Sequence, residues 1–248
     1  MNSSFSLEGK TILVTGASSG IGQTIALFLS HNGAKVAISG RNKDRLTATY
    51  ECLSPNETHL ITTADLNNAD EIDNLSETMP VLDGVVFCAG AIEYHPAKQI
   101  TVENLNAIMD INFKSQIMLY KALHSKRKIA KNASLVFISS IAAQMATPAT
   151  LVYAASKAAI ISSVRVLASE LSKLNIRVNS ISPGLVKTPL LEKSEVEKEI
   201  FAENEAKYPL GLCEVEDIAN AVLFLLSDAS KKITGIDLVV DGGYLLKH

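Results

Sequence analysis

A short apolar strand that runs straight into a glycine-rich turn and then into a helix is the feature that most limits how this chain can fold. Residues 10–15 read as the strand, residues 16–22 are Gly-Ala-Ser-Ser-Gly-Ile-Gly, and a helical pattern covers residues 23–32. Glycine permits a tight turn and a close approach of backbone to phosphate, and a helix start offers free N–H groups at the positive end of its dipole. This order predicts a nucleotide-binding βα unit, with a ligand-free turn as the alternative.

The remainder of the chain alternates between strand and helix patterns. Strands are predicted at residues 34–39, 59–62, 83–87, 135–138, 175–182 and 236–240, and helices at 70–77, 101–131 with a possible break near Asn112, 149–174 and 214–226. The alternation predicts an α/β fold, a parallel sheet with helices on both faces. Because no linker, repeat or low-complexity segment interrupts it, residues 1–248 are expected to form a single domain.

Composition excludes several classes of function. The net charge of -3 gives no sign of a nucleic-acid partner or of an anionic membrane, and no apolar run approaches the ~18–20 residues of a spanning helix. The first ten residues lack the apolar core of a signal peptide. Three distant cysteines and five scattered histidines show no metal-ligand spacing, so no metal site is predicted. Reduced thiols in a cytoplasmic protein are expected.

The stretch from residue 135 to 157 carries the residues with the most chemical content. Ser140 follows a buried strand, and Tyr153 and Lys157 lie four residues apart on a predicted helix, where they share a face. A cation beside a phenol lowers its pKa from about 10, toward the range where an acid acts near neutral pH. The Ser140 hydroxyl can polarise a carbonyl oxygen. The alternative is an amphipathic tyrosine with a solvated lysine, a common pair on helices.

The end of the second predicted strand bears on the choice of cofactor. In nicotinamide-binding folds an acidic residue there grips the 2′-hydroxyl of NAD, but this chain has Gly-Arg-Asn-Lys at residues 40–43. A guanidinium suits a 2′-phosphate through forked, charge-assisted hydrogen bonds, so Arg41 favours NADP, with a solvated loop arginine as the alternative. After the third strand, Asp65 and Leu66 can lie near adenine or can belong to a helix N-cap region.

Four other segments lead to predictions. Cys88 precedes Ala89 and Gly90, small residues that let a ligand approach the backbone, and is interpreted as a buried small hydrophobe. The amide of Asn112 lies in an apolar pattern and needs partners if buried. Lysines of residues 126–131 are placed at a helix end, where cations favour the dipole. Residues 189–210, charged and bounded by prolines, are predicted to be a substrate lid.

Together these pieces resemble the short-chain dehydrogenase/reductase family over essentially the whole chain. The matching residues are Thr15, Gly16, Gly20, Ile21, Gly22, Asp65, Ala89, Gly90, Asn112, Ser140, Tyr153, Lys157, Pro183, Gly184 and Thr188. Cys88 departs from the family's usual Asn-Ala-Gly, whose asparagine helps to hold the loop beside the cofactor. The length and the Val-Asp-Gly-Gly tail at residues 240–243 are similar to those of bacterial 3-oxoacyl-[acyl-carrier-protein] reductases, a less specific likeness.

The resemblance implies a Rossmann-type, doubly wound, seven-stranded parallel sheet in the order 3-2-1-4-5-6-7. It implies that Tyr153 is the general acid that protonates the carbonyl oxygen as hydride arrives, that Lys157 lowers the tyrosine pKa and binds the nicotinamide ribose, and that Ser140 orients the carbonyl. Asn112 would support a water-linked proton relay. The expected NADP(H)-binding residues are Gly16, Ser18, Ser19, Gly20, Ile21, Gly22, Arg41, Asp65, Leu66, Ala89, Gly90, Tyr153, Lys157, Pro183, Gly184, Val186 and Thr188.

The expected activity is NADP(H)-dependent reduction of a ketone to a secondary alcohol, on a small-molecule or acyl-carrier-bound carbonyl such as a 3-oxoacyl thioester. The alternative substrates are a sugar, a polyol or a secondary-metabolite ketone, and residues 93–98 and 189–210 are expected to decide between them. A nucleotide sensor without turnover would be expected to lose one of Ser140, Tyr153 or Lys157, and all three are present.

A homotetramer is also expected. Family members pair two long helices, here about residues 101–130 and 152–173, in a four-helix interface. The second of these helices carries apolar or small residues around its circumference, more than one face against the sheet requires. These residues are Ala155, Ala158, Ile160, Ile161, Val164, Val166 and Leu167.

Overall fold

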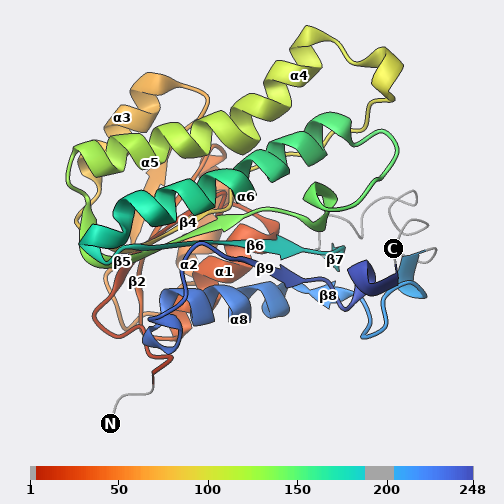
Figure 1. Cartoon of the computed structure of the whole chain (residues 1–248). Coiled ribbons are helices and arrows are strands. Elements are labelled where there is room, and N and C mark those ends of the chain that lie inside the picture. The colour runs from red at the N-terminus through yellow and green to blue at the C-terminus, as the bar shows by residue number, and fades with distance from the viewer. Residues whose placement is uncertain (1–3, 188–203, 248) are drawn as a thin grey trace.

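The computed structural model describes residues 4–187 and 204–247, and their centre is a parallel sheet (Figure 1). Seven strands lie in the order β3-β2-β1-β4-β5-β6-β9, and every neighbouring pair is parallel. The strands are β1 Thr11–Thr15, β2 Lys35–Gly40, β3 Leu60–Thr63, β4 Leu82–Phe87, β5 Ile129–Ile138, β6 Arg177–Pro183 and β9 Asp237–Val240. The predicted doubly wound fold and its strand order are confirmed, with β9 as the seventh strand.

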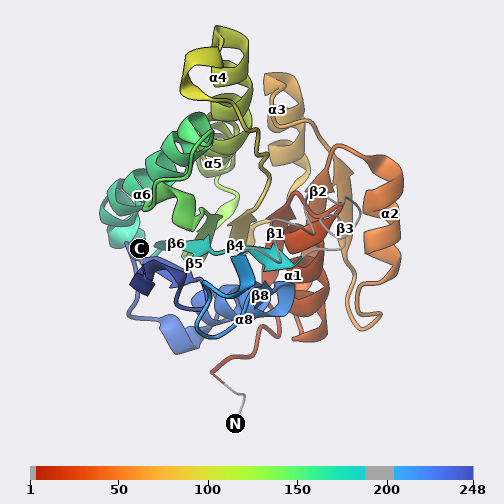
Figure 2. The same ribbon diagram turned by 90° about the vertical axis from the view of Figure 1, so that its right-hand side faces the viewer.

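Helices cover both faces of the sheet (Figures 1 and 2). Helices α1 (Gly20–His31), α2 (Lys43–Glu51) and α8 (Val215–Leu226) pack on one face, and α3 (Ala69–Thr78), α5 (Ser115–Ser125) and α6 (Leu151–Leu171) pack on the other. Side chains alternate between these two cores along a strand, since Ile12 and Val14 of β1 face one core and Leu13 faces the other. Burial on both faces explains why the strands read as continuous apolar runs.

The region predicted as one helix from 101 to 131 has three parts. Helix α4 (Val102–Met109) passes through a π-helical turn (Asp110–Lys114) into α5. The possible break near Asn112 is therefore confirmed as a π-turn. The extension to residue 131 was wrong: the chain reverses at Arg127, which has a φ of 56°, and β5 begins two residues later.

Lys126 lies at the end of α5, as predicted for this helix end, and the lysines near the reversal also contact α3. The Lys126 ammonium contacts the carboxylates of Asp73 (3.0 Å) and Glu77 (2.7 Å). That of Lys128 donates to the carbonyls of Glu77 (2.9 Å) and Met79 (2.7 Å). The two lysines thus fasten the start of β5 to the end of α3.

Several short elements were not predicted from the sequence. Helix α2 is largely exposed and buries only Leu46 and Thr49, and the side chain of Asn42 caps it by accepting from the Arg45 N–H. A two-stranded ladder joins β7 (Val186–Lys187) to β8 (Cys213–Glu214). Residues 189–203 of the predicted lid lie outside the described residues.

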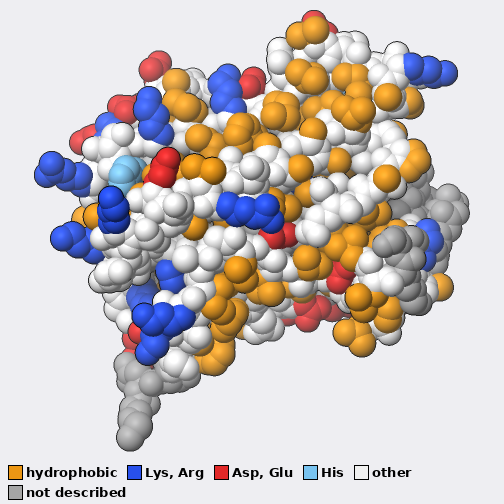
Figure 3. Space-filling model, in the orientation of Figure 1, with side chains coloured by type: hydrophobic (Ala, Val, Ile, Leu, Met, Phe, Trp, Pro, Cys, Tyr) orange, Lys and Arg blue, Asp and Glu red, His pale blue; other side chains and the backbone are white. Residues whose placement is uncertain are grey.

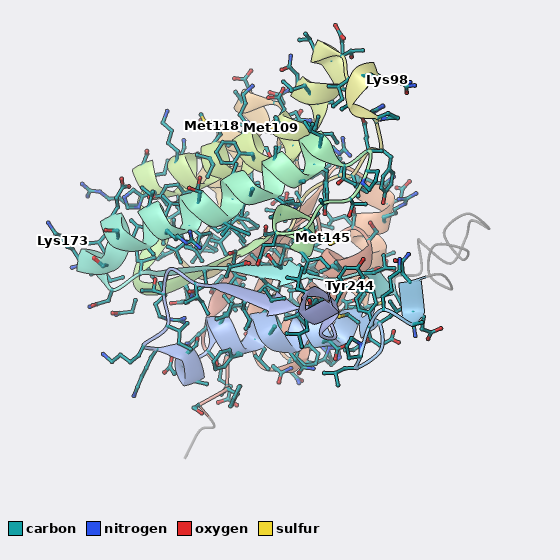
Figure 4. The ribbon with its side chains drawn as sticks, turned by 45° about the vertical axis from the view of Figure 1, so that its right-hand side comes forward. Lys98, Met109, Met118, Met145, Lys173 and Tyr244 are labelled. Carbon is teal, nitrogen blue, oxygen red and sulfur yellow. The ribbon has the colours of Figure 1, made fainter. Side chains whose placement is uncertain are left out.

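The remaining part of that predicted lid packs onto the C-terminal segment. Tyr208 is buried, packs against Tyr244 in a tilted arrangement with 4.7 Å between ring centroids, and accepts a hydrogen bond from the Leu185 N–H at 2.9 Å. Met145 and Tyr244 belong to this cluster and are labelled in Figure 4. The C-terminal turn therefore covers the chain just after β6.

Among the described residues, one helix is long and apolar enough to cross a membrane by length and composition, Leu151–Leu174. Its inner side chains, among them Ile160 and Val164, are fully or almost fully buried against the sheet. Because a helix that covers a sheet is also apolar, this finding is weak evidence for a membrane span.

Candidate functional site

The predicted site residues gather at one edge of the sheet. Gly16 to Gly22 follow β1, Arg41 follows β2, Asp65 and Leu66 follow β3, Ala89 and Gly90 follow β4, Ser140 follows β5, and Pro183 to Val186 lead from β6 into β7. Thr188 lies outside the described residues. Because the carboxyl ends of parallel strands meet at one edge, where open α/β sheets bind ligands, the topology alone brings these residues together.

The glycine turn leaves space that side chains would fill. Gly16 has a φ of 67°, and a Cβ there would lie 2.9 Å from the Ala89 Cα. A Cβ at Gly22 would collide with the Gly16 carbonyl. Ser19, the N-cap residue of α1, makes no side-chain cap hydrogen bond, so the first-turn N–H groups keep their capacity for an anion. This turn fits the pyrophosphate of a dinucleotide.

The neighbouring edge of the turn is held against β2. The Ala17 N–H donates to the Ser39 carbonyl at 3.1 Å, and the Thr49 hydroxyl of α2 donates to the Ala17 carbonyl at 3.0 Å. A Cβ at Gly40 would lie 3.2 Å from the Ser18 hydroxyl. Arg41 follows directly and is exposed. The turn therefore adjoins the place where a ribose phosphate would meet Arg41.

After β3, Asp65 shapes the chain that leads into α3. Its backbone N–H donates to the Glu71 carboxylate at 2.8 Å, and its own carboxylate accepts from the Asn67 N–H at 3.0 Å. The N-cap of α3 is Asn68, not Asp65. Leu66 is buried. Asp65 thus stands half-exposed beside the β2 end, with its turn already hydrogen-bonded.

The loop after β4, which we call the 88–91 loop, separates the glycine turn from α6. The Thr15 hydroxyl accepts from the N–H groups of Cys88 (3.1 Å) and Ala89 (3.3 Å). The Asn112 amide accepts from the Ala91 N–H at 2.8 Å and donates to the Ala91 carbonyl at 2.9 Å. Burial raises the pKa of the Cys88 thiol to about 12, which is consistent with its interpretation as a small hydrophobe.

Asn112 finds all its side-chain partners in protein. Besides Ala91, its amide donates to the Ser156 hydroxyl at 3.0 Å, and Ser156 in turn donates to the Tyr153 carbonyl at 2.7 Å. The fully buried amide therefore fastens the 88–91 loop to α6. The proton-relay role implied for Asn112 stays a prediction.

Lys157 lies at the centre of the site. Its ammonium donates to the Ile138 carbonyl at the end of β5 (2.9 Å), and a Cβ at Gly90 would lie 3.5 Å from it. Burial lowers the pKa of Lys157 from about 10.5 to about 8. The nitrogen is 5.8 Å from the centroid of the Tyr153 ring, so the predicted pairing of phenol and ammonium exists.

The expected direction of the Tyr153 pKa shift was wrong for the chain alone. Burial raises the pKa of Tyr153, a hydrogen bond with the Ser140 hydroxyl opposes the rise, and the nearby Tyr94 adds to it. Lys157, whose ammonium donates to the Ile138 carbonyl and lies 5.8 Å from the ring centroid, does not reverse this rise. The neutral phenol, a proton donor, is the form that this site favours.

Sequence reasoning missed two residues that hold the site and gave no role to a third. Thr49 binds the Ala17 carbonyl of the glycine turn, and Gln116 of α5 donates to the Ala89 carbonyl at 2.8 Å. Thr15, named only as a motif residue, binds the backbone of Cys88 and Ala89. The one available signal was a polar side chain at a position with apolar neighbours. Within the two described ranges, no group of three or more His, Cys, Asp or Glu side chains is placed to hold a metal.

Comparison with known proteins agrees with this geometry. The family model described as "Enoyl-(Acyl carrier protein) reductase" matches residues 16–245. The 3-oxoacyl-[acyl-carrier-protein] reductase of Rickettsia felis is 36% identical, over 97% of this chain and 98% of its own. Glucose 1-dehydrogenase of Gluconobacter oxydans is 35% identical, over 96% and 92%.

A solved structure of a short-chain alcohol dehydrogenase from Sinorhizobium meliloti has the same fold. It superimposes with a TM-score of 0.90 at 28% identity and covers 98% of this chain and 99% of its own. The likeness thus spans the sheet, the glycine turn and the Tyr153–Lys157 helix, and the chain belongs to the short-chain dehydrogenase/reductase family.

Proposed function

We propose that this enzyme is an NADP(H)-dependent oxidoreductase that reduces a ketone to a secondary alcohol. The observation that carries the proposal is the placing of the Ser140 and Tyr153 hydroxyls together, next to a buried lysine and one loop away from the glycine turn. Membership of an oxidoreductase family supports the reaction class.

The chain's own residues supply binding, orientation and a proton. A bound nicotinamide supplies the hydride. The Ser140 hydroxyl donates a hydrogen bond to the carbonyl oxygen and fixes its position, and the Tyr153 phenol gives its proton to that oxygen. Burial raises the pKa of Tyr153, so the phenol holds its proton at neutral pH and is in the form that can give it to the carbonyl oxygen. Lys157 places a buried positive charge beside the tyrosine, where it stabilises the phenolate left behind.

The preference for NADP rests on Arg41. It stands at the end of β2, next to the Ser18 and Gly40 contact, and the 40–43 segment holds no carboxylate that would repel a phosphate. An arginine binds a phosphate through two parallel charge-assisted hydrogen bonds. The name of the Rickettsia relative is consistent with this choice but leaves it open.

A 3-oxoacyl thioester is the substrate we favour, since a 3-oxoacyl-[acyl-carrier-protein] reductase is similar along the full chain. A sugar or polyol is the second candidate, supported by the glucose dehydrogenase relative and by one structural feature. The His95 imidazole pairs with the Glu93 carboxylate at 3.0 Å. The backbone N–H of His95 donates to the Ala149 carbonyl just before α6. This polar pair near the Tyr153 helix suits hydroxyl groups better than an acyl chain.

A panel assay tests both candidates. NADPH oxidation would be followed with a 3-oxoacyl-carrier substrate, its thioester analogue, an enoyl thioester and a simple ketone, and NADP reduction with glucose and polyols. The proposal expects turnover of a carbonyl and higher kcat/KM with NADPH than with NADH. Activity on the enoyl thioester alone, or none on any ketone or alcohol, would overturn it. Activity on glucose and none on the thioesters would select the second candidate.

We further propose that the enzyme works as a single-domain homotetramer in the cytoplasm. One match to each relative covers 97% and 96% of this chain, which supports a single domain over these residues. The outer surfaces of α5 and α6 carry apolar side chains, Met118 and Val166 among them, that a single copy leaves exposed.

A further inference from the structure

The 88–91 loop lies between the glycine turn and Lys157 and contacts both. On one side its Ala89 backbone lies within contact distance of Gly16 in the glycine turn. On the other, Gly90 abuts the Asn112 amide and the Lys157 ammonium, at 2.9 and 3.5 Å from where a Cβ would be. A small displacement of this loop would therefore move the pyrophosphate cradle and the catalytic lysine together.

Three side chains hold this loop through its backbone. Thr15 binds the first two N–H groups and Asn112 binds both polar groups of Ala91. The Ala89 carbonyl between them is bound by the Gln116 amide at 2.8 Å. Gln116 lies four residues beyond Asn112, so both amides project toward the loop from one side of the helical segment.

Burial of the Gln116 side chain is expected to cost free energy of folding, which its hydrogen bond to the Ala89 carbonyl can offset. Its side chain is fully buried, and its amide oxygen has no hydrogen-bond partner. A buried acceptor without a partner costs free energy, which an apolar residue of the same size would avoid. Among the described residues, the hydrogen bond from the Gln116 amide nitrogen to the Ala89 carbonyl is the contact that offsets the cost of the unpaired amide oxygen.

Cys88 leaves the loop without a strong hydrogen-bonding side chain at its first position. It occupies the first position of the loop, and its neutral thiol is only a weak hydrogen-bond donor. A side-chain amide at this position would be able to bind neighbouring backbone groups and hold the loop from within. With Cys88 in place, the loop has to be held from outside, and Gln116 reaches it from α5.

We propose that Gln116 is a positioning residue for the 88–91 loop and that it compensates for the absence of a hydrogen-bonding side chain at position 88. Gln116 touches neither the cofactor site nor the substrate site directly. It acts through Ala89 on the glycine turn and through Gly90 on Lys157. The expected effect of Gln116 on NADPH binding rests on the proposed function. Its expected effect on the order of the loop does not.

The first test removes the bond with Gln116→Met, which keeps the length of the side chain. NADPH affinity would be measured by fluorescence titration, and amide hydrogen exchange of the peptide that contains the loop would be measured without cofactor. Leaving a buried carbonyl without its donor should weaken NADPH binding by roughly tenfold and speed exchange in the loop. Ser134→Ala is the matched control, because it also removes a buried bond to a carbonyl, that of Leu225 at 2.7 Å, away from the site. It should alter neither readout.

The second test is rescue. Cys88→Asn should restore most of the NADPH affinity in the Gln116→Met background and change little in the wild-type background. Gln116→Asn, whose amide is too short to reach Ala89, replaces Gln116→Met if that variant does not fold. Wild-type affinity in the Gln116 variant, or an equal effect of Cys88→Asn in both backgrounds, would overturn the proposal. If the wild type binds no nicotinamide cofactor, the proposed function fails, and the exchange experiment still decides the role of Gln116.

Discussion

Burial moves the two ionisable residues at the centre of the site toward their neutral forms. It raises the pKa of Tyr153 and lowers that of Lys157 to about 8, since a low-dielectric surrounding disfavours charge of either sign. The tyrosine is thereby kept as an acid, and the lysine keeps its charge near neutral pH while titrating above it. At neutral pH the proposed carbonyl reduction would therefore start from a protonated phenol beside a lysine that is mostly charged.

Tyr153→Phe should abolish turnover and leave cofactor affinity nearly unchanged, because the ring stays and the acidic hydroxyl is lost. General acid catalysis supplies about 10²–10⁴-fold, so kcat should fall at least that far. Steady-state rates and a fluorescence titration of NADPH measure the two effects. Tyr120→Phe, on the half-buried surface of α5, is the control and should keep its rate. A Tyr153 variant with more than about a tenth of the wild-type rate would show that another group is the acid.

Arg41→Ala should weaken NADPH binding and spare NADH. Loss of a charge-assisted hydrogen bond costs about 1.5–3 kcal/mol, which corresponds to about a ten- to a hundredfold rise in the NADPH dissociation constant. Parallel titrations with both cofactors measure the change. Lys43→Ala, also exposed and two residues further on, tests whether charge in this segment is enough. Equal losses for NADPH and NADH would count against the assignment of Arg41 to the 2′-phosphate.

The depressed pKa of Lys157 predicts a rise of stability with pH. Unfolded lysine keeps its proton up to about pH 10.5, whereas folded Lys157 releases it near pH 8. Between these values the unfolded state binds more protons, so the free energy of unfolding increases with pH. From about pH 8 to 10 the gain is on the order of 2 kcal/mol. Urea unfolding of wild type and Lys157→Met across this range measures it, and parallel curves for the two proteins would contradict the prediction.

At the scale of elements, helix propensity and packing favour different residues at Gly22, near the start of α1. Alanine is favoured over glycine in a helix by about 1 kcal/mol, but a Cβ at Gly22 would enter the Gly16 carbonyl. Overpacking against backbone costs about 1–3 kcal/mol, so Gly22→Ala should lower the Tm and weaken NADPH binding. Gly9→Ala is the control: it has open space around it and a φ of 75°, and should leave cofactor affinity unchanged. A more stable Gly22→Ala protein would show that the turn can move.

The regular elements could be predicted because apolar patterns determine them. The buried strands that precede Gly16 and Ser140 could be recognised from their apolar runs. The break near Asn112 showed as a polar residue in an apolar stretch. Helix α2 was missed because it buries only two side chains and carries no apolar stripe. The overlong helix before β5 failed because a chain reversal at Arg127 leaves no signal in a run of charged residues.

The site residues could be placed from the sequence only as far as motifs and strand ends reach. The glycine turn and the Tyr153–Lys157 pair follow from spacing on local elements. The Gln116 contact with Ala89 joins residues far apart in sequence, and the direction of the Tyr153 pKa shift depends on how deeply tertiary packing buries the phenol. Neither quantity is local, so neither was accessible before the fold was known.

At the scale of the whole molecule, the outer surface of α5 and α6 exposes apolar side chains that a single copy does not cover. Apolar side chains lie among charged ones over this upper half in Figure 3. Met118 of α5 is 38% exposed and Val166 of α6 is 55% exposed. Val164, one of the apolar residues around the circumference of α6, is buried in the core against the sheet, so a substitution there tests folding and not assembly.

The enzyme is predicted to be a homotetramer that buries this surface against second copies related by two-fold axes. Light scattering at micromolar concentration should give a mass near four times 26.6 kDa. Val166→Glu and Met118→Glu place a charge where a single copy exposes the side chain, so they should split the assembly and leave each subunit folded by circular dichroism. Figure 4 shows Met118 on α5 and Lys173 just beyond the end of α6. Lys173→Glu, already exposed and charged, should keep the tetramer, and a wild-type mass of one subunit would refute the assembly outright.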